Sequence, residues 1–324
     1  MEKKGERMKV AIGIPTYKNH QRITNLINSI YTFTKFNDEY KIVILDDGTQ
    51  DQKHIDKLKE LSENYDIPLI LNGNNQGIPY SWNKLTEYYD DAEYMVLFND
   101  DIQVRSADWL SSIIYFLEEN KCGAVGFPIM HINPVTGQMA EGYSLPNENS
   151  LPGRVGCPVG CSFGFKRELW KQVKQPDGGV GFWKNLISFY EETDFGFELA
   201  KMGYDSYMLP CPAVEHWGSQ TFANNVELST RIISSYLPKE EYIELLKKAP
   251  NKMSIPVDVH IKLAEEKNMA YRMDYSRMMF AKKWGCTDYY NVPQVETHQR
   301  YVDPFPRRII KWIDVKGNKK EQEI

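Results

Sequence analysis

The stretch YMVLFNDDIQV at residues 94–104 decides how this chain folds. Five consecutive apolar residues at 94–98 run directly into the polar cluster Asn99-Asp100-Asp101. A short apolar run that ends in polar residues is typical of a strand buried on both faces of a parallel sheet. Residues 94–98 are therefore predicted to form a central strand, with the polar cluster at its carboxyl end.

Three similar short runs precede this one, at residues 10–14, 41–45 and 69–71. The longer segments between the runs carry apolar residues at three- and four-residue spacing, which is typical of amphipathic helices. These segments are 22–33, 51–65 and 78–89. Strands that alternate with helices build βαβ units. The chain is therefore predicted to be an α/β protein with a mostly parallel central sheet flanked by helices.

The pattern changes beyond the fourth strand. Asp108 is expected to cap the next helix, and Gly203 is expected to end a later one. The elements predicted after residue 104 are a helix at 109–117, mixed strands and loops over 122–166, a helix at 191–202, strands at 206–209 and 213–216, and helices at 225–236, 239–248 and 257–284.

The composition excludes several classes of protein. The 324 residues carry 44 Asp and Glu against 39 Lys and Arg, a net charge of −5. Binding nucleic acid through bulk electrostatics needs a basic face, so nucleic acid is not expected as a partner. Neither a signal peptide nor a membrane span is predicted, which favours a cytoplasmic location. The five cysteines are odd in number and scattered, so buried free thiols are expected rather than disulfides.

The C-terminal residues 305–324 hold six Lys and Arg but only three acids. Their segment FPRRIIKWI combines basic and apolar residues, a composition that can bind an anionic membrane surface. A docked or frayed terminus is the other interpretation of the same residues. Peripheral membrane contact therefore stays open, as does the formation of a homo-oligomer.

Small polar clusters follow all four predicted strands. They are Pro15-Thr16-Tyr17, Asp46-Asp47-Gly48, Asn72-Gly73-Asn74-Asn75 and Asn99-Asp100-Asp101. The carboxyl ends of parallel strands meet at one edge of an open sheet, and ligands bind at that edge. The four clusters are therefore predicted to form one site.

Two absent motifs narrow the choice of ligand. The chain has neither G-x-G-x-x-G after its first strand nor G-x-x-x-x-G-K-[ST], so no backbone cradle for phosphate is expected. It offers carboxylates instead, and carboxylates bind phosphate through a divalent cation. Asp100 and Asp101 are the expected place for that ion.

Five stretches together resemble family 2 glycosyltransferases of the GT-A fold. They are VAIGIPTYKN (10–19), IVILDDGTQD (42–51), LILNGNNQGIPYSWNK (69–84), YMVLFNDDIQV (94–104) and YEETDFGFELAKMGYDSYMLP (190–210). The resemblance covers residues 8–222 in the family's order and spacing. It implies a catalytic domain at 1–224, with a nucleotide-sugar half at 8–104 and an acceptor half at 122–222. A helical extension with a basic tail is expected at 225–324.

The resemblance assigns roles residue by residue. Nucleotide-sugar binding is implied for Pro15, Thr16, Tyr17, Asp46 or Asp47, Asn75, Gly77, Asn83 and Asp100. A tyrosine suits this place because its ring can stack on a nucleobase. Asn99 replaces the first acid of the family's Asp-x-Asp motif, which leaves Asp101 as the expected direct ligand of Mn2+ or Mg2+. His216, in VEHWGSQTF (214–222), is the second expected metal ligand.

The family's base motif matches Glu191-Glu192-Thr193-Asp194 at a predicted helix start. By position Glu192 is the expected catalytic base and Asp194 the second candidate, although acids here can also serve only to cap the helix. Acceptor binding is expected at Cys161, Ser162, Trp183 and Trp217. The segment Gly178-Gly179-Val180-Gly181 is expected to form a lid that closes over the donor.

The implied function is transfer of a sugar from a nucleoside diphosphate, with a UDP-sugar favoured, to a hydroxyl of a saccharide or lipid-linked saccharide. The resemblance implies metal-assisted single displacement, which inverts the anomeric configuration. Two alternatives stay open: a sugar-nucleotide nucleotidyltransferase, and a non-catalytic protein that binds nucleotide sugars or carbohydrates.

Overall fold

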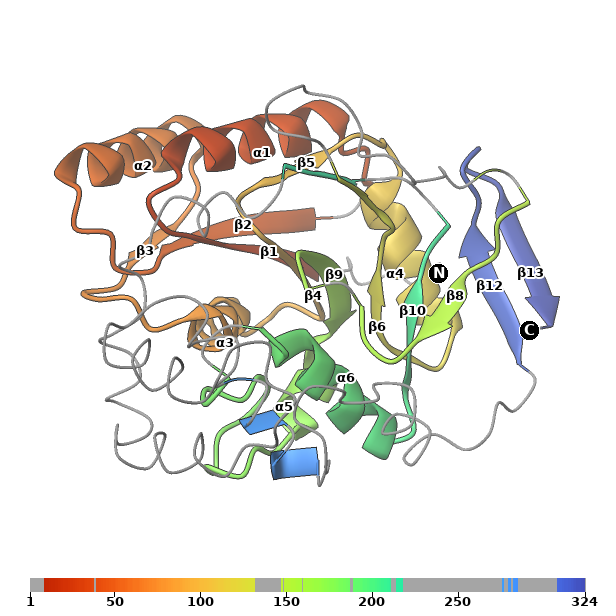
Figure 1. The fold of residues 1–324 in the computed structure, drawn as a ribbon. Helices are drawn as coiled ribbons and strands as arrows, with labels where there is room; N and C mark the ends of the chain where they lie inside the picture. Colours follow the sequence, from red (N-terminus) through yellow and green to blue (C-terminus); the bar gives the residue numbers. More distant parts are fainter. Residues whose placement is uncertain are drawn as a thin grey trace, which may run out of the picture.

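The structure, a computed structural model, is built around an eight-stranded sheet of order β3-β2-β1-β4-β9-β6-β10-β8 (Figure 1). It describes residues 9–37, 39–131, 147, 149–158, 160–186, 189–210, 214–217, 276, 279–280, 282–284 and 308–323. The sheet strands are β1 (Lys9–Thr16), β2 (Glu39–Asp46), β3 (Leu69–Leu71), β4 (Tyr94–Phe98), β6 (Cys122–Gly126), β8 (Gly153–Val155), β9 (Ser162–Lys166) and β10 (Asp205–Met208). The four strands predicted before residue 100 are confirmed, with bounds that differ by two residues at most.

The sheet is mixed, and its parallel part carries the polar clusters. Strands β3, β2, β1 and β4 are parallel neighbours, as the βαβ pattern predicts. Strand β9 runs antiparallel to both β4 and β6. Strand β10 is parallel to β6 and antiparallel to β8. The predicted α/β fold class is therefore confirmed, and the antiparallel strands lie in the second half of the sheet.

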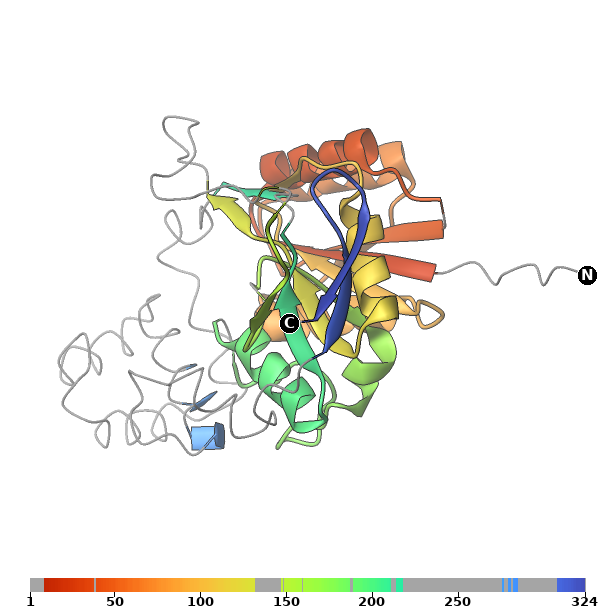
Figure 2. The same cartoon turned by 90° about the vertical axis from the view of Figure 1, so that its right-hand side faces the viewer.

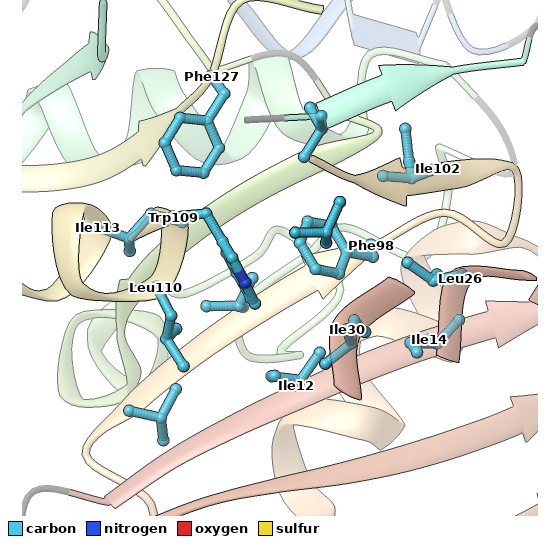
Figure 3. Close-up of a cluster of buried hydrophobic side chains, with 14 of the residues drawn as sticks. Ile12, Ile14, Leu26, Ile30, Phe98, Ile102, Trp109, Leu110, Ile113 and Phe127 are labelled. Atoms are coloured by element: carbon cyan, nitrogen blue, oxygen red, sulfur yellow. The ribbon is translucent and has the colours of Figure 1, made fainter. Parts of the chain in front are cut away.

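Helices cover both faces of the sheet (Figure 1). One face packs against α1 (His20–Phe33), α2 (Gln52–Tyr65) and α4 (Trp109–Glu119), and the other against α3 (Ile78–Tyr88), α5 (Arg167–Gln172) and α6 (Glu191–Lys201). Alternate residues of a strand point to opposite faces. Ile12 and Ile14 of β1 therefore join the α1 and α4 layer (Figure 3), whereas Ala11 joins the α3 and α6 layer.

Asp108 stands directly before α4, as predicted, but its carboxylate makes no capping hydrogen bond. The helix is held instead by its apolar residues. Trp109 and Leu110 are fully buried in the first turn, and Trp109 lies beside Phe98 in the cluster drawn in Figure 3.

A second, three-stranded sheet consists of β5 (Ile102–Val104), β11 (Val214–His216) and β7 (Ile129–His131) in the order β5-β11-β7. Its strand β11 is the one predicted at 213–216. The antiparallel register pairs His216 with Ile102, which brings His216 next to the polar cluster that follows β4. The candidate site depends on this pairing of segments 114 residues apart.

The basic tail of the predicted extension is docked on the protein, one of the two interpretations left open, and it forms strands rather than a helix. Strands β12 (Ile309–Ile313) and β13 (Lys319–Glu323) form an antiparallel hairpin, which lies beside α4 (Figure 2). Ile310 and Trp312 are buried, and the Asn120 side chain donates to the carbonyl of Lys311 (2.8 Å) and accepts from its N–H (3.0 Å). Burial alternates along β12, where Ile310 and Trp312 face the protein, and Gly317 at φ 82° makes the turn to β13.

This hairpin gives Ile310 and Trp312 a role in the core rather than on a membrane surface. In the described ranges no helix is long and apolar enough to cross a membrane. Of the predicted C-terminal helices, the one at 257–284 is represented by helical residues 276, 279–280 and 282–284. The helices predicted at 225–236 and 239–248 lie outside the described residues.

The cysteines that the structure describes are free thiols, as expected. Cys122 and Cys161 are buried and Cys157 is half-buried. Burial raises the pKa of each of these thiols. Cys211 and Cys286 lie outside the described residues.

Candidate active site

The carboxyl ends of the parallel strands meet at one edge of the sheet. Thr16 pairs with Asp46, and Asp46 pairs with Leu71. Strand β9 runs the opposite way and starts at this edge, where Ser162 pairs with Phe98. The Asn99 N–H donates to the carbonyl of Cys161 (2.9 Å). The predicted clusters therefore converge, and the start of β9 joins them.

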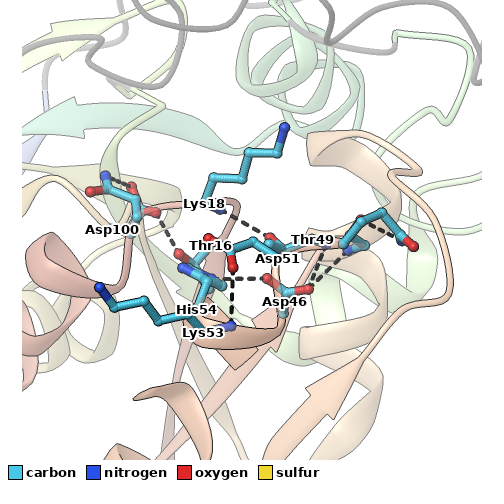
Figure 4. A network of polar contacts seen from close by, with 11 residues as sticks. Thr16, Lys18, Asp46, Thr49, Asp51, Lys53, His54 and Asp100 are labelled. Carbon is cyan, nitrogen blue, oxygen red and sulfur yellow. Dashed lines mark hydrogen bonds and ion pairs between the residues drawn. The ribbon is translucent and has the colours of Figure 1, made fainter. Parts of the chain in front are cut away.

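Asp100 is fixed by the turn that follows β1. The Thr16 hydroxyl donates to its Oδ2 (2.6 Å; Figure 4), and the Asn19 amide donates to its Oδ1 (3.1 Å). Burial, together with the charge of Asp101, raises the pKa of Asp100 to about 7. The Asp100 side chain is thus held in one orientation at the sheet edge.

Asp101 and His216 form the candidate metal site. Their atoms Oδ2 and Nε2 are 3.2 Å apart, and the Trp217 N–H donates to the Asp101 carbonyl (3.0 Å). Oδ1 of Asp101 is buried without a hydrogen-bond partner among the described residues. A buried carboxylate oxygen needs a partner, and carboxylate with imidazole suits Mn2+.

No group of three or more metal-ligating side chains occurs within the ranges that the structure describes. A two-ligand arrangement suffices for Mn2+ or Mg2+ at a nucleotide site, because substrate phosphates and water supply the remaining ligands. Asp101 and His216 therefore fit the ion that the resemblance implies.

Glu192 reaches the same edge from the first turn of α6. It is half-buried, and burial raises its pKa to about 7. Its carboxyl group packs directly on Gly160: a Cβ added there would lie 2.9 Å from the Glu192 Cδ. The Cys161 thiol lies close enough to both Asp101 and Glu192 for their charges to raise its pKa further. The segment Gly160-Cys161 therefore links the two candidates: Glu192 packs on Gly160, and the Cys161 carbonyl accepts from the N–H of Asn99, two residues before Asp101.

The backbone is strained directly before these acids. Phe189 and Tyr190 have φ angles of 73° and 68°, a region that bulky residues rarely adopt. Such strain is concentrated at functional sites. Glu191 follows with its Oε2 buried and unpartnered in the described part of the chain, and burial together with Glu192 raises its pKa.

Asp46 has a structural role. Its Oδ2 accepts from the N–H groups of Gly48 (3.2 Å) and Thr49 (2.8 Å), and its Oδ1 lies 3.2 Å from His54 Nε2 (Figure 4). The sequence interpretation gave His54 no role. The helical spacing of His54, Leu58 and Leu61, all buried on one side of α2, is the signal that could have placed it next to the sheet.

Asp47 ties two of the predicted clusters together. Its carboxylate accepts from the Asn72 side chain (2.9 Å) and from the N–H groups of Gln76 (2.9 Å) and Gly77 (2.8 Å). Gly77, at φ 93°, begins α3. The loop that carries Asn75 is thereby fixed against the end of β2.

Two further predicted site residues, Asn83 and Asp194, also bind protein partners, as Asp46 and Asp47 do. Asn83 donates to the Phe182 carbonyl (2.8 Å) and accepts from the Phe182 N–H (2.9 Å) and from Trp170 Nε1 (3.0 Å). These contacts use its amide oxygen and one of its two N–H donors, so they favour a structural role over the donor contact predicted for Asn83. Asp194 is fully buried and ion-paired to Lys283 (2.7 Å), which favours Glu192 over Asp194 as the candidate base.

The remaining predicted residues divide between the site and the core. Pro15 lies inside β1 and Tyr17 follows it half-buried. Trp217 is half-buried, and the Arg22 guanidinium lies 4.8 Å from its ring centroid. Ser162 and Trp183 are buried. Trp183 lies beside Lys283 (5.2 Å), so it packs in the core rather than on an open acceptor surface.

The glycine-rich segment is fastened rather than free. Lys174 and Val180 form an antiparallel bridge, and the Gly181 N–H donates to the Val173 carbonyl (3.0 Å). Gly181, at φ 75°, leaves no room for a Cβ beside the Trp170 indole. These contacts favour a fixed hairpin over the hinged lid predicted for 178–181.

Comparisons with known proteins support the sequence resemblance. Residues 11–173 match the family model described as Glycosyl transferase family 2. No curated protein matched the sequence.

Three solved structures share the fold at low identity. GalNAc-T7 with UDP, GalNAc and Mn2+ has a TM-score of 0.57 and 13% identity, covering 99% of this chain and 65% of that one. TarS 1–349 of S. aureus in complex with UDP-GlcNAc has a TM-score of 0.52 and 15% identity; the match covers 91% of this chain and 78% of that one. The mannosyltransferase PcManGT from Pyrobaculum calidifontis, in complex with GDP-Man and Mn2+, has a TM-score of 0.51 and 17% identity; the match covers 86% of this chain and 74% of that one. At these identities the likeness shows the fold alone.

Proposed function

The chain belongs to glycosyl transferase family 2, and from this premise we propose that it transfers a sugar from a nucleoside-diphosphate sugar to an acceptor hydroxyl. One observation carries the proposal. Glu192 packs on Gly160, and the next residue, Cys161, hydrogen-bonds to Asn99, two residues before Asp101; Oδ1 of Asp101 is buried with no hydrogen-bond partner among the described residues. A transferase of this kind needs one carboxylate for a metal and a separate one for a proton.

Asp101 and His216 would hold the metal ion, Mn2+ or Mg2+. When bound, the ion supplies positive charge that stabilises a leaving diphosphate. Asp100, held by Thr16 and Asn19, would orient the donor through its ribose. The Tyr17 ring would stack on the nucleobase. The complexes of GalNAc-T7 and PcManGT contain Mn2+, which is why Mn2+ is the first ion to test.

Glu192 would act as the base. As the acceptor oxygen forms its bond to the anomeric carbon, the bond from that carbon to the diphosphate oxygen breaks, and the acceptor proton passes to Glu192. The nucleoside diphosphate leaves with the electron pair. A pKa near 7 suits this step, because a general base works best when its pKa is close to the operating pH. A single displacement of this kind inverts the anomeric configuration.

We propose a UDP-sugar as donor and a saccharide or lipid-linked saccharide as acceptor. The complexes of GalNAc-T7 and TarS hold UDP or UDP-GlcNAc, whereas that of PcManGT holds GDP-Man. The net charge of −5 gives no support to a nucleic-acid acceptor. Trp217, half-buried beside the metal candidate, is the aromatic residue proposed to pack on the acceptor sugar.

The test is release of nucleoside diphosphate from a panel of nucleotide sugars, with and without Mn2+. The wild-type chain is expected to release UDP with Mn2+ present. Glu192→Gln is expected to abolish release while keeping donor binding, measured as a rise in unfolding temperature. Glu168→Gln, an exposed acid on α5, is the control that should keep activity.

The alternatives give different results. A nucleotidyltransferase would form pyrophosphate from a nucleoside triphosphate and a sugar phosphate. A non-catalytic binding protein would bind the donor without releasing nucleoside diphosphate. Glu192→Gln could then change only the affinity for the donor.

A further inference from the structure

The side of α6 away from Glu192 carries two buried acids. Asp194 and Glu198 are one helical turn apart, and their side chains are 0% and 8% exposed. Carboxylates buried to this degree need a cation or several hydrogen bonds. For both Asp194 and Glu198 the cation comes from a segment about 90 residues further along the chain.

Lys283 supplies the cation. Its Nζ lies 2.7 Å from Asp194 Oδ1 and 2.8 Å from Glu198 Oε1, and it donates to Gln175 Oε1 at 2.7 Å. The three N–H donors of one ammonium group therefore meet three acceptors. The Lys283 side chain is only 7% exposed, so little solvent screens these contacts.

Trp284 completes the shell around Asp194. Its Nε1 donates to Asp194 Oδ1 (2.8 Å), and the Gln175 side chain donates to Oδ2 (3.2 Å). With Lys283 these contacts fix both carboxylate oxygens of Asp194. Residues 283 and 284 thereby fix helix α6 at Asp194, two residues after Glu192.

The same segment also holds the residue two positions before Glu192. The ring of Phe280 lies 5.2 Å from that of Tyr190 and 5.4 Å from that of Phe197. Tyr190 is the second of the two consecutive residues before Glu191 that have a positive φ. Strained conformations persist only where surrounding contacts enforce them, and Phe280 supplies one such contact.

We propose that Phe280, Lys283 and Trp284, here named the C-terminal anchor, position Glu192 for catalysis by holding Tyr190 and Asp194 on either side of it. Lys283 is a positioning residue that acts through Asp194. The proposal rests on Glu192 being the base. The family match ends at residue 173, so it covers neither α6 nor the anchor.

The first experiment compares Lys283→Met with Lys282→Met in the full-length chain. Lys282 is the exposed neighbour, which makes it a matched control. We expect Lys283→Met to lower kcat by about 10- to 100-fold, because a small misplacement of a catalytic group costs that much. The KM for the donor and its Mn2+-dependent protection against unfolding should stay unchanged. Lys282→Met should behave like the wild type.

Two further variants keep the test decisive if Lys283→Met folds poorly. Lys283→Arg keeps the charge and should recover much of the kcat. The double variant Asp194→Asn/Lys283→Met removes both charges of the pair, which buried sites often tolerate. It should bind donor normally with a low kcat. Full kcat in the double variant, or in Lys283→Met, would overturn the proposal.

Amide hydrogen exchange separates this proposal from the proposed function. In Lys283→Met the amides of residues 189–194 should exchange faster, with no such change in Lys282→Met. A wild-type chain without turnover would refute the proposed function but leave this measurement valid. Unchanged exchange at 189–194 would refute the anchor, even in a chain with full activity.

Discussion

Glu192→Gln is predicted to stabilise the protein while it removes activity. Burial raises the pKa of Glu192 from 4.5 to about 7. A carboxyl group shifted this far costs the folded state about 3 kcal/mol once it is fully ionised. Glu192 is half-buried, and allowing for solvent screening leaves about 2 kcal/mol. Glutamine has almost the same shape and no charge, so the variant avoids this cost.

The predicted gain depends on pH with a definite sign. Because the folded-state pKa is raised, the stability contributed by the protonated group is fully present below pH 4.5. It is lost as the pH rises through about 7. Glu192→Gln should therefore unfold at nearly the same temperature as the wild type near pH 4.5. At pH 8 its unfolding temperature should be higher by about 4–8 °C, from about 2–4 °C per kcal/mol.

Thermal unfolding of both proteins at pH 4.5 and pH 8 measures this effect, with Glu168→Gln as the exposed control. The charge of Glu192 contributes to the raised pKa of Glu191. Removing that charge should therefore also make the ionised form of Glu191 less costly, which adds to the stability gained by Glu192→Gln. A variant less stable than the wild type at pH 8 would contradict the reasoning. So would an equal difference at both pH values, because burial of the charge would then not be the cause.

Four further predictions concern single groups. The kcat/KM should fall about tenfold per pH unit below pH 7 as Glu192 takes up a proton, as a pH profile would show. Gly160→Ala should lower kcat with donor binding kept, because the new Cβ would lie 2.9 Å from the Glu192 Cδ; unchanged turnover would argue against this contact. Asp101→Asn should raise the Mn2+ concentration for half-maximal activity by at least about tenfold. Asn120→Ala should cost about 2 kcal/mol in thermal unfolding, since two hydrogen bonds to β12 are lost.

The parallel half of the fold could be predicted because its signals are local. Residues 94–98 are apolar without a break, and all five are buried in β4. The polar clusters that follow the strands converge because parallel strands end at the same edge. Asp100 and Asp101 follow directly from this rule.

The structural roles of Asn83 and Asp194 could not be predicted, because their partners are distant in the sequence. Asn83 binds Phe182, 99 residues away, and Asp194 binds Trp284, 90 residues away. A polar side chain at a motif position can face either the ligand or a buried neighbour. Only the packing of the later segment decides which, and no local pattern encodes that packing.

A docked C-terminus was one of two interpretations left open, but its hairpin form was not predicted. The segment IIKWI has one lysine among four apolar residues, which fits both a membrane-surface segment and a half-buried strand. What separates the two is whether a protein surface is there to receive Ile310 and Trp312. Helix α4 provides it, with Asn120 pairing to both backbone groups of Lys311.

Glu192 and Asp194 lie on one helix turn, and burial raises the pKa of both, although Lys283 and Trp284 lower that of Asp194 in part. What separates them is how their carboxylate oxygens are used. Lys283 forms an ion pair with Asp194, and the Asp194 oxygens also accept hydrogen bonds from Trp284 and Gln175. A proton that binds to Asp194 would have to replace one of these contacts. Among the described residues Glu192 has no cationic partner, so burial alone raises its pKa. A carboxylate that is costly to keep ionised accepts a proton readily. The anchor therefore occupies both carboxylate oxygens of Asp194, which is why the half-buried Glu192 is the proposed base on this helix.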